Sequence, residues 1–96
     1  MIQNKTISLT DIVVHREGMI VTDMDGETVM LSIENGKYYN LGSVGGEIWE
    51  LLISPVEVSK VVASIAEEYD VERSLCEEQV IEFLEHLAKE QLIRVN

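Results

Sequence analysis

Two dipeptides, Asp25-Gly26 and Asn35-Gly36, restrict the possible folds of this chain more than any other part of its sequence. Both tolerate the positive φ angles of a type I′ turn, the tight turn that joins two hairpin strands. The residues on either side alternate in polarity, as strand residues do. The sequence therefore predicts three antiparallel strands between Met19 and Leu41.

The segment between the two turns is expected to be the middle strand. One of its faces is apolar and the other is mixed, and the two sets are Val29, Leu31 and Ile33 against Thr28, Met30 and Ser32. Tyr38 to Leu41 would form the third strand. Residues 1–18, with Ile12-Val13-Val14, could be a further extended segment whose placement the sequence leaves open.

After Gly42 the apolar spacing changes from two to about 3.6 residues, which indicates helices. The first helix is expected to bury one side, with Val44, Ile48, Leu51 and Leu52, although Gly45 and Gly46 should weaken its opening turn. A second helix would begin at the capping-box pattern Ser54-Pro55-Val56-Glu57, or a residue or two later. Its apolar positions are Val58, Val61, Val62, Ile65 and Tyr69.

A third and longest helix is predicted from a second capping box, Ser74-Leu75-Cys76-Glu77, to about Gln91. Its apolar residues cover an arc of roughly 160°, wider than the stripe of a simply docked helix, so one edge should stay uncovered. The arc holds Phe83, Cys76, Leu87, Val80, Leu84, Ala88 and Ile81. The stretch 92–95 would be a short extended tail. Strands followed by helices predict one α+β domain over residues 1–96.

Composition excludes several classes of function. Eighteen acidic and seven basic residues give a net charge of -11, which repels nucleic acid and anionic lipid. No apolar run approaches the roughly 20 residues of a membrane span, and residues 1–6 lack the apolar core of a secretion signal. The single Cys76 cannot form an internal disulfide. These features favour a cytoplasmic protein.

The sequence offers no catalytic, metal-binding or cofactor-binding set of residues. His15 and His86 stand far apart, at no metal-ligand spacing to each other or to Cys76. The stretch 23–27 resembles the opening of a calcium loop, but its glycine comes too early, and a tight hairpin explains it better. No phosphate-binding or serine-hydrolase motif is present. We therefore expect that the chain is not an enzyme.

Several short motifs in a fixed order give the chain a family resemblance. They are Gly36-Lys37-Tyr38-Tyr39-Asn40-Leu41-Gly42, Ile48-Trp49-Glu50-Leu51-Leu52, Glu68-Tyr69-Asp70-Val71, and Val80-x-x-Phe83-Leu84-x-x-Leu87 before Leu92-Ile93. Together they resemble the PqqD-like peptide recognition elements, and within these the free-standing members of lasso-peptide biosynthesis. The resemblance implies a winged-helix-like fold with a three-stranded antiparallel sheet followed by three helices.

The resemblance also implies the function and the site. The leader of a ribosomally made precursor peptide would add as a strand beside the third strand and lie in a groove against the third helix. That implies a peptide-binding set of Lys37, Tyr38, Tyr39, Asn40, Leu41, Cys76, Gln79, Val80, Phe83, Leu84 and Leu87. Which of the helical residues line the groove and which fill the core is left open.

Two positions depart from the family pattern. Gln79 stands where many relatives have Asp, which puts a charged contact with the leader in doubt. Gln91 stands where Gly commonly ends the last helix, so the left-handed cap is in doubt. By analogy with lasso systems, the implied partners are a leader peptidase and a macrolactam-forming synthetase. The alternatives are a peptide carrier for a radical (radical-SAM) or other peptide-modifying enzyme and, less favoured because of its acidic third helix, a winged-helix transcription factor.

Overall fold

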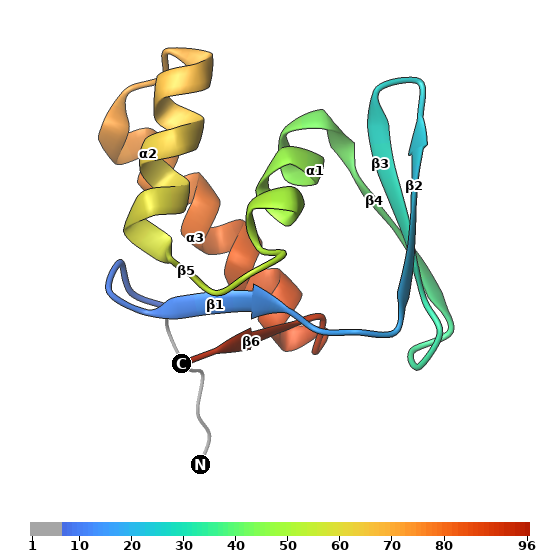
Figure 1. The fold of residues 1–96 in the computed structure, drawn as a ribbon. Helices are drawn as coiled ribbons and strands as arrows, with labels where there is room; N and C mark the ends of the chain where they lie inside the picture. Colours follow the sequence, from blue (N-terminus) through green and yellow to red (C-terminus); the bar gives the residue numbers. More distant parts are fainter. Residues whose placement is uncertain (1–6) are drawn as a thin grey trace.

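The larger sheet of the molecule contains the three strands that the two turns predict, and three helices follow it (Figure 1). The structure is a computed structural model that describes residues 7–96, so the expectations about residues 1–6 lie outside the described part. The sheet has the order β2-β3-β4 and is antiparallel throughout. Its strands are β2 Met19–Met24, β3 Glu27–Ser32 and β4 Lys37–Leu41. The predicted α+β class is confirmed.

The two turns differ from each other. Asp25 and Gly26 have φ angles of 57° and 83°, as a type I′ turn requires. At the second turn the type I′ prediction is wrong, because only Gly36 has a positive φ angle, of 67°. There a four-residue loop joins Ser32 to Lys37, and the Gly36 N–H donates to the Ser32 carbonyl over 2.8 Å. The Ser32 hydroxyl accepts from the Asn35 N–H at 3.1 Å, which stabilises this wider loop.

The mixed face of β3, and not its apolar face, packs against the helices. Met30 is fully buried and Ser32 is 2% exposed, whereas Val29 and Leu31 are half-buried. Helix α1, Gly42–Leu51, packs closely on this inner face. A Cβ atom at Gly46 would lie 2.0 Å from Thr28 Oγ1 and 2.6 Å from Thr28 Cβ. Gly46 therefore allows the helix to approach the strand.

A second, smaller sheet lies below the helices in Figure 1 and has the order β5-β1-β6. It confirms the extended character of Ile12-Val13-Val14 and of the tail. Its strands are β1 Ile12–His15, β5 Val56–Glu57 and β6 Ile93–Val95. Sequence patterns do not predict that these segments pair, because strands of two to four residues are too short to show a period.

Both predicted capping boxes are wrong. Helix α2 is Val58–Tyr69 and begins after Glu57, because Val56–Glu57 is paired with β1. Helix α3 is Arg73–Lys89 and begins one residue before Ser74. The residues that precede the two helices, Glu57 and Glu72, make no side-chain capping hydrogen bond.

The end of α3 has the left-handed cap that Gln91 put in doubt. Gln91 adopts a φ angle of 62°. The Leu92 N–H donates to the Leu87 carbonyl at 2.9 Å, and the Gln91 N–H donates to the Ala88 carbonyl at 3.0 Å. This pair of bonds is the Schellman motif, and the buried side chains of Leu87 and Leu92 accompany it. A non-glycine residue is tolerated there because the core holds both sides of the turn.

The hydrophobic core lies between the three helices and the two sheets. Trp49 of α1 is 5% exposed and stacks on His15 of β1, with the ring centroids 5.0 Å apart. Of the residues predicted to line α1, Ile48 and Leu52 are buried, whereas Val44 and Leu51 remain exposed. On α3 the buried residues are Cys76, Val80, Leu84 and Leu87. The core thus connects the helices to both sheets.

Candidate functional site: the open edge of β4 and the adjoining pocket

Strand β4 is an edge strand. Within residues 7–96 it pairs with β3 on one side and with no strand on the other. The amino-terminal strand β1 pairs with β5 and β6 instead and leaves this edge uncovered. Antiparallel strands direct the main-chain groups of alternate residues to opposite sides. The Ile33 N–H donates to the Gly18 carbonyl on the β2 side, so the main-chain groups of Met30 and Ser32 point the other way, toward β4. There they meet Tyr39 and Lys37, with which they are paired. The main-chain groups of Tyr38 and Asn40 are therefore directed to the open edge.

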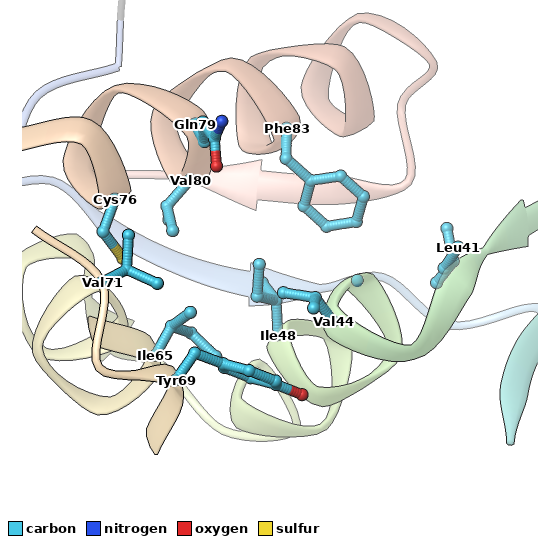
Figure 2. Close-up of a pocket in the computed structure, with 11 residues that line it drawn as sticks. Leu41, Val44, Ile48, Ile65, Tyr69, Val71, Cys76, Gln79, Val80 and Phe83 are labelled. Carbon is cyan, nitrogen blue, oxygen red and sulfur yellow. The ribbon is translucent and has the colours of Figure 1, made fainter. Parts of the chain in front are cut away.

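An apolar pocket opens next to the end of β4, between α1, the end of α2 and the part of α3 from Cys76 to Phe83 (Figure 2). Its volume is about 310 Å³. Such a volume is at the small end of the range of ligand pockets, which begins at about 300 Å³. It is lined by Leu41, Val44, Gly45, Ile48, Ile65, Tyr69, Val71, Cys76, Gln79, Val80 and Phe83.

The structure divides the predicted peptide-binding residues into three groups. Five of them line the pocket, namely Leu41, Cys76, Gln79, Val80 and Phe83. Four lie on β4 before the pocket, namely Lys37, Tyr38, Tyr39 and Asn40. The remaining two, Leu84 and Leu87, are 0% and 1% exposed and belong to the core.

Sequence reasoning missed the lining residues that α1 and α2 contribute. Tyr69 and Val71, at the end of α2 and just after it, lie opposite α3 in Figure 2. Val44 of α1, which the sequence placed on the buried side of the helix, stays 39% exposed beside the pocket. The sequence could not show that the ends of α1 and α2 meet α3 here, since helix packing angles depend on the whole core.

Phe83 lies at the mouth of the pocket, across from Leu41 (Figure 2). Its ring atoms Cζ and Cε1 lie 3.0 and 3.1 Å from the position that a Cβ atom of Gly45 would occupy. The absence of a side chain at Gly45 therefore makes room for the ring. Phe83 is half-buried, so part of the ring faces solvent. It is the α3 residue best placed to contact an apolar ligand group that enters from β4.

Cys76 belongs to the apolar wall. It is 2% exposed, and its Sγ lies 3.6 Å from the Val62 carbonyl oxygen. Burial raises the pKa of its thiol, and the nearby Arg73 only partly opposes that effect. A thiol with a raised pKa remains neutral at pH 7 and is a poor nucleophile. Cys76 therefore has a packing role.

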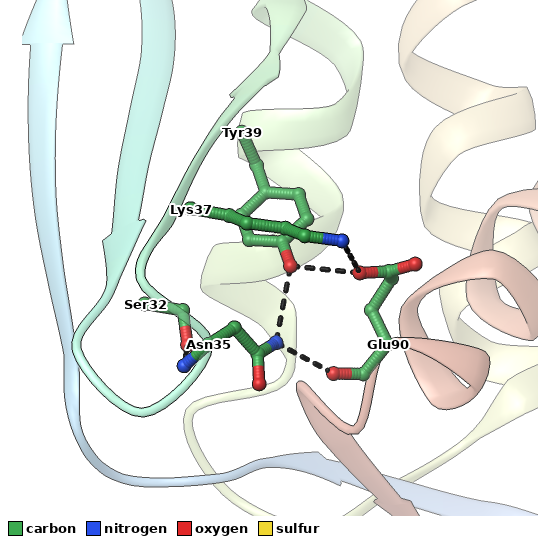
Figure 3. A network of polar contacts seen from close by, with 5 residues as sticks. All are labelled: Ser32, Asn35, Lys37, Tyr39 and Glu90. Atoms are coloured by element: carbon green, nitrogen blue, oxygen red, sulfur yellow. Dashed lines mark hydrogen bonds and ion pairs between the residues drawn. The ribbon is translucent and has the colours of Figure 1, made fainter.

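Polar contacts join the β3–β4 hairpin to the end of α3 (Figure 3). The Tyr39 hydroxyl donates to Glu90 Oε1 at 2.8 Å, and Lys37 Nζ lies 3.7 Å from the same oxygen. The Asn35 amide donates to the Glu90 carbonyl at 2.9 Å and to the Tyr39 hydroxyl at 3.0 Å. The hydrogen bond from Tyr39, followed by the charges of Lys37 and His86, lowers the pKa of the Glu90 carboxyl. This polar bridge fixes the hairpin relative to α3.

Two acidic side chains, Glu47 and Glu68, lie next to Tyr69 of the pocket lining and form an acidic rim there. A hydrogen bond with Glu47 is the main cause that raises the pKa of Glu68, and burial and charge repulsion add to it. Burial first, and then a hydrogen bond with Glu47, raise the pKa of the Tyr69 hydroxyl. Glu47 Oε1 is also shielded from solvent without a hydrogen-bond donor. The rim therefore carries negative charge that is only partly compensated.

No group of three or more His, Cys, Asp or Glu side chains in residues 7–96 is arranged to hold a metal ion. Over the same residues, no helix is long and apolar enough to cross a membrane.

Comparison with known proteins identifies the family. Residues 27–93, from β3 to the start of β6, match the family described as coenzyme PQQ synthesis protein D (PqqD). The chain belongs to the PqqD family. This result confirms the resemblance that the sequence motifs carry. A comparison with curated proteins found no match.

Two solved structures share the PqqD fold with this chain. One is TbiB1 in complex with the TbiA(beta) leader peptide, which has 31% sequence identity and a TM-score of 0.76. That match covers 84% of this chain and 94% of TbiB1. The other is the PqqD part of PqqCD from Methylobacterium extorquens, described as a stand-alone RiPP recognition element, where RiPP denotes a ribosomally synthesised and post-translationally modified peptide. Its identity is 18%, its TM-score 0.76, and the match covers 91% of this chain and 93% of that one.

Proposed function

We propose that this PqqD-family domain binds the leader of a ribosomally made precursor peptide, which adds as a strand to the open edge of β4. The observation that carries the proposal is the uncovered edge at Tyr38 and Asn40 beside the apolar pocket behind Leu41. Strand addition draws affinity from main-chain hydrogen bonds, and neighbouring pockets select side chains. The leader peptide bound to TbiB1, a relative of 31% identity, supports the same kind of ligand here.

The leader is proposed to place one large apolar side chain in the pocket, against Phe83 and Val44. Full burial of such a side chain contributes about 1.5–3 kcal/mol, and each net hydrogen bond about 1 kcal/mol. Ordering a flexible peptide costs several kcal/mol, so the sum gives a reversible complex. Gln79 lines the pocket as a neutral group. Basic leader residues would instead meet the acidic rim at Glu47 and Glu68.

The peptide pathway is proposed to be that of a lasso peptide, because the sequence motifs resemble the free-standing members of lasso-peptide biosynthesis. TbiB1, the more similar of the two solved relatives, is likewise bound to a leader peptide. The domain would act without catalysis in the cytoplasm and would present the leader-bearing precursor to a leader peptidase and a macrolactam-forming synthetase. Genes that neighbour the gene for this chain provide a direct check. A radical enzyme encoded there, with no macrolactam-forming synthetase, would favour the alternative carrier role.

The proposal can be tested at Tyr38, where two substitutions separate main chain from side chain. Its side chain is 77% exposed, and its N–H is directed to the open edge. Tyr38→Pro removes that N–H without removing a bond to β3, and an edge strand tolerates proline in this orientation. Tyr38→Thr removes the same side chain but keeps the N–H.

A fluorescently labelled leader peptide should bind the wild type and Tyr38→Thr with similar affinity in an anisotropy titration. Tyr38→Pro should weaken binding by about fivefold or more, because one hydrogen bond is worth about 1 kcal/mol. Circular dichroism must show that both variants are folded. Equal leader affinity of folded Tyr38→Pro and Tyr38→Thr would contradict binding at this edge.

Phe83→Asp tests the pocket in the same assay, because a carboxylate at its mouth would oppose an apolar anchor. Val80 is unsuitable for this test. It is 3% exposed, so an Asp at position 80 would place a charge in the core and unfold the domain.

A further inference from the structure

The face of the β2-β3-β4 sheet that points away from the helices carries a row of large apolar side chains. Ile20 is paired with Leu31, and Leu31 is paired with Tyr38, so the three side chains lie next to each other across the sheet. Ile20 is 54% exposed, Tyr38 is 77% exposed and Leu31 is half-buried. Val29, also half-buried, lies two residues from Leu31 on the same face. We call Ile20, Val29, Leu31 and Tyr38 the outer patch.

The outer patch is not needed for the core of the domain. The opposite face of β3 already packs on the helices through Met30 and Ser32, which are 0% and 2% exposed. Strands with apolar residues on both faces are typical of sheets that are covered on both sides. Contiguous exposed apolar surface on a small domain commonly marks a binding surface for another protein.

We propose that the outer patch is the docking surface for an enzyme that processes the leader-bearing peptide. This proposal rests on the proposed function. Tyr38 belongs both to the outer patch and to the open edge of β4. A peptide strand added to that edge would continue the sheet, and its outward side chains would extend the row that Ile20, Leu31 and Tyr38 begin. An enzyme on the outer patch would therefore contact the bound leader as well.

The charges around the outer patch indicate which kind of partner surface would be complementary to it. Asp23, Asp25 and Glu27 are exposed at the β2–β3 turn, and Glu34 is exposed in the next loop. The whole chain carries a net charge of -11. A second copy of the domain would bring two such acidic rims together, which opposes association. The complementary surface is therefore apolar at its centre and basic at its rim, and it belongs to a different protein.

The test uses the complete chain, loaded with leader peptide, and the purified leader peptidase and macrolactam-forming synthetase as probes. Biolayer interferometry would measure binding of each enzyme to the wild type and to Ile20→Lys. The lysine replaces an exposed residue of the outer patch and would place a charge against the apolar centre of the partner surface. The control is Leu75→Lys, which has the same charge change at a 44% exposed leucine of α3. Anisotropy would measure leader binding for all three proteins.

The expected result is that Ile20→Lys weakens binding of at least one enzyme by about tenfold or more, as loss of a central contact does. Leader affinity should stay within about twofold of the wild type, and Leu75→Lys should bind like the wild type. A higher salt concentration should weaken enzyme binding, because the proposed rims have opposite charges.

Unchanged binding of both enzymes to Ile20→Lys, or no binding of either enzyme to the wild type, would overturn the docking proposal while leaving leader recognition intact. Loss of leader binding by the wild type would instead refute the proposed function. Sedimentation velocity would test whether a second copy of the domain binds the outer patch. A dimer of the wild type that Ile20→Lys converts to a monomer would show that the outer patch binds a second copy, and the proposal would fail.

Discussion

Replacement of Gly46 by alanine tests the close contact between α1 and β3, because two physical effects predict opposite results. In an isolated helix the change should stabilise, since alanine is better than glycine by about 1 kcal/mol. In this fold the new Cβ would lie 2.0 Å from Thr28 Oγ1 and 2.6 Å from Thr28 Cβ. Rotation of the Thr28 side chain moves Oγ1 but not Cβ, so the helix and the strand have to separate.

Overpacking of this kind costs about 1–3 kcal/mol, and the contact here is at the severe end of that range. After subtraction of the helix propensity gain, Gly46→Ala should lower the free energy of unfolding by about 1–2 kcal/mol. For a domain of this size each kcal/mol shifts the melting temperature by about 4–8 °C. Thermal and urea unfolding followed by circular dichroism would measure both values.

Gly45→Ala is the matched control on the same helix. Its Cβ would meet the half-buried ring of Phe83 at 3.0 Å and Leu41 Cβ at 3.2 Å, contacts that shifts of a few tenths of an ångström relieve. It should therefore cost less than Gly46→Ala. Thr28→Ala should recover part of the loss in the double variant, because it removes Oγ1. A melting temperature of Gly46→Ala above that of the wild type would refute the packing argument.

Two further predictions concern carboxyl groups. Tyr39→Phe removes the main hydrogen bond that lowers the pKa of Glu90, so a carboxyl NMR titration should show this pKa rising toward its ordinary value. An unchanged Glu90 pKa would show that the charges of Lys37 and His86 dominate instead. The raised pKa of Glu68 means that its charged form destabilises the fold above the folded pKa, and that this effect vanishes as pH falls below the ordinary carboxyl value of about 4.3. Glu68→Gln should consequently raise the melting temperature at pH 7 but not at pH 3, and an equal gain at both values, or a gain as large for Glu67→Gln, would contradict this.

The parts of the fold that the sequence predicted are those fixed by local chemistry. Asp25-Gly26 determines a tight hairpin by itself, and the change of period after Gly42 marks the helices. The second turn was predicted less well, because the Ser32 hydroxyl and the contacts of Asn35 with α3 stabilise a wider loop. The β5-β1-β6 sheet could not be predicted, since its pairs join residues far apart in the chain.

The candidate site was predictable in outline only. The family resemblance indicated β4 and α3, and Val80 and Phe83 of α3 line the pocket beside β4. Leu84 and Leu87 have the same apolar character, but the rotation of α3 in the core places them away from the pocket. The lining by Tyr69 and Val71 depends on where α2 ends, which is set by the left-handed residue Asp70 with a φ angle of 54°.

The polar bridge at Glu90 joins the two walls of the groove, α3 and β4, which are held in place by different contacts. The α3 wall is part of the core, whereas the β4 wall belongs to a hairpin that continues into α1 at Gly42, a residue with a φ angle of 75°. A tilt of the hairpin about Gly42 would widen the entrance for a bulkier guest, but it would also disturb the packing of Met30 and Thr28 against the helices. Only part of its energetic cost would come from the polar contacts of Lys37, Tyr39 and Asn35 near Glu90, and salt and pH act on that part alone.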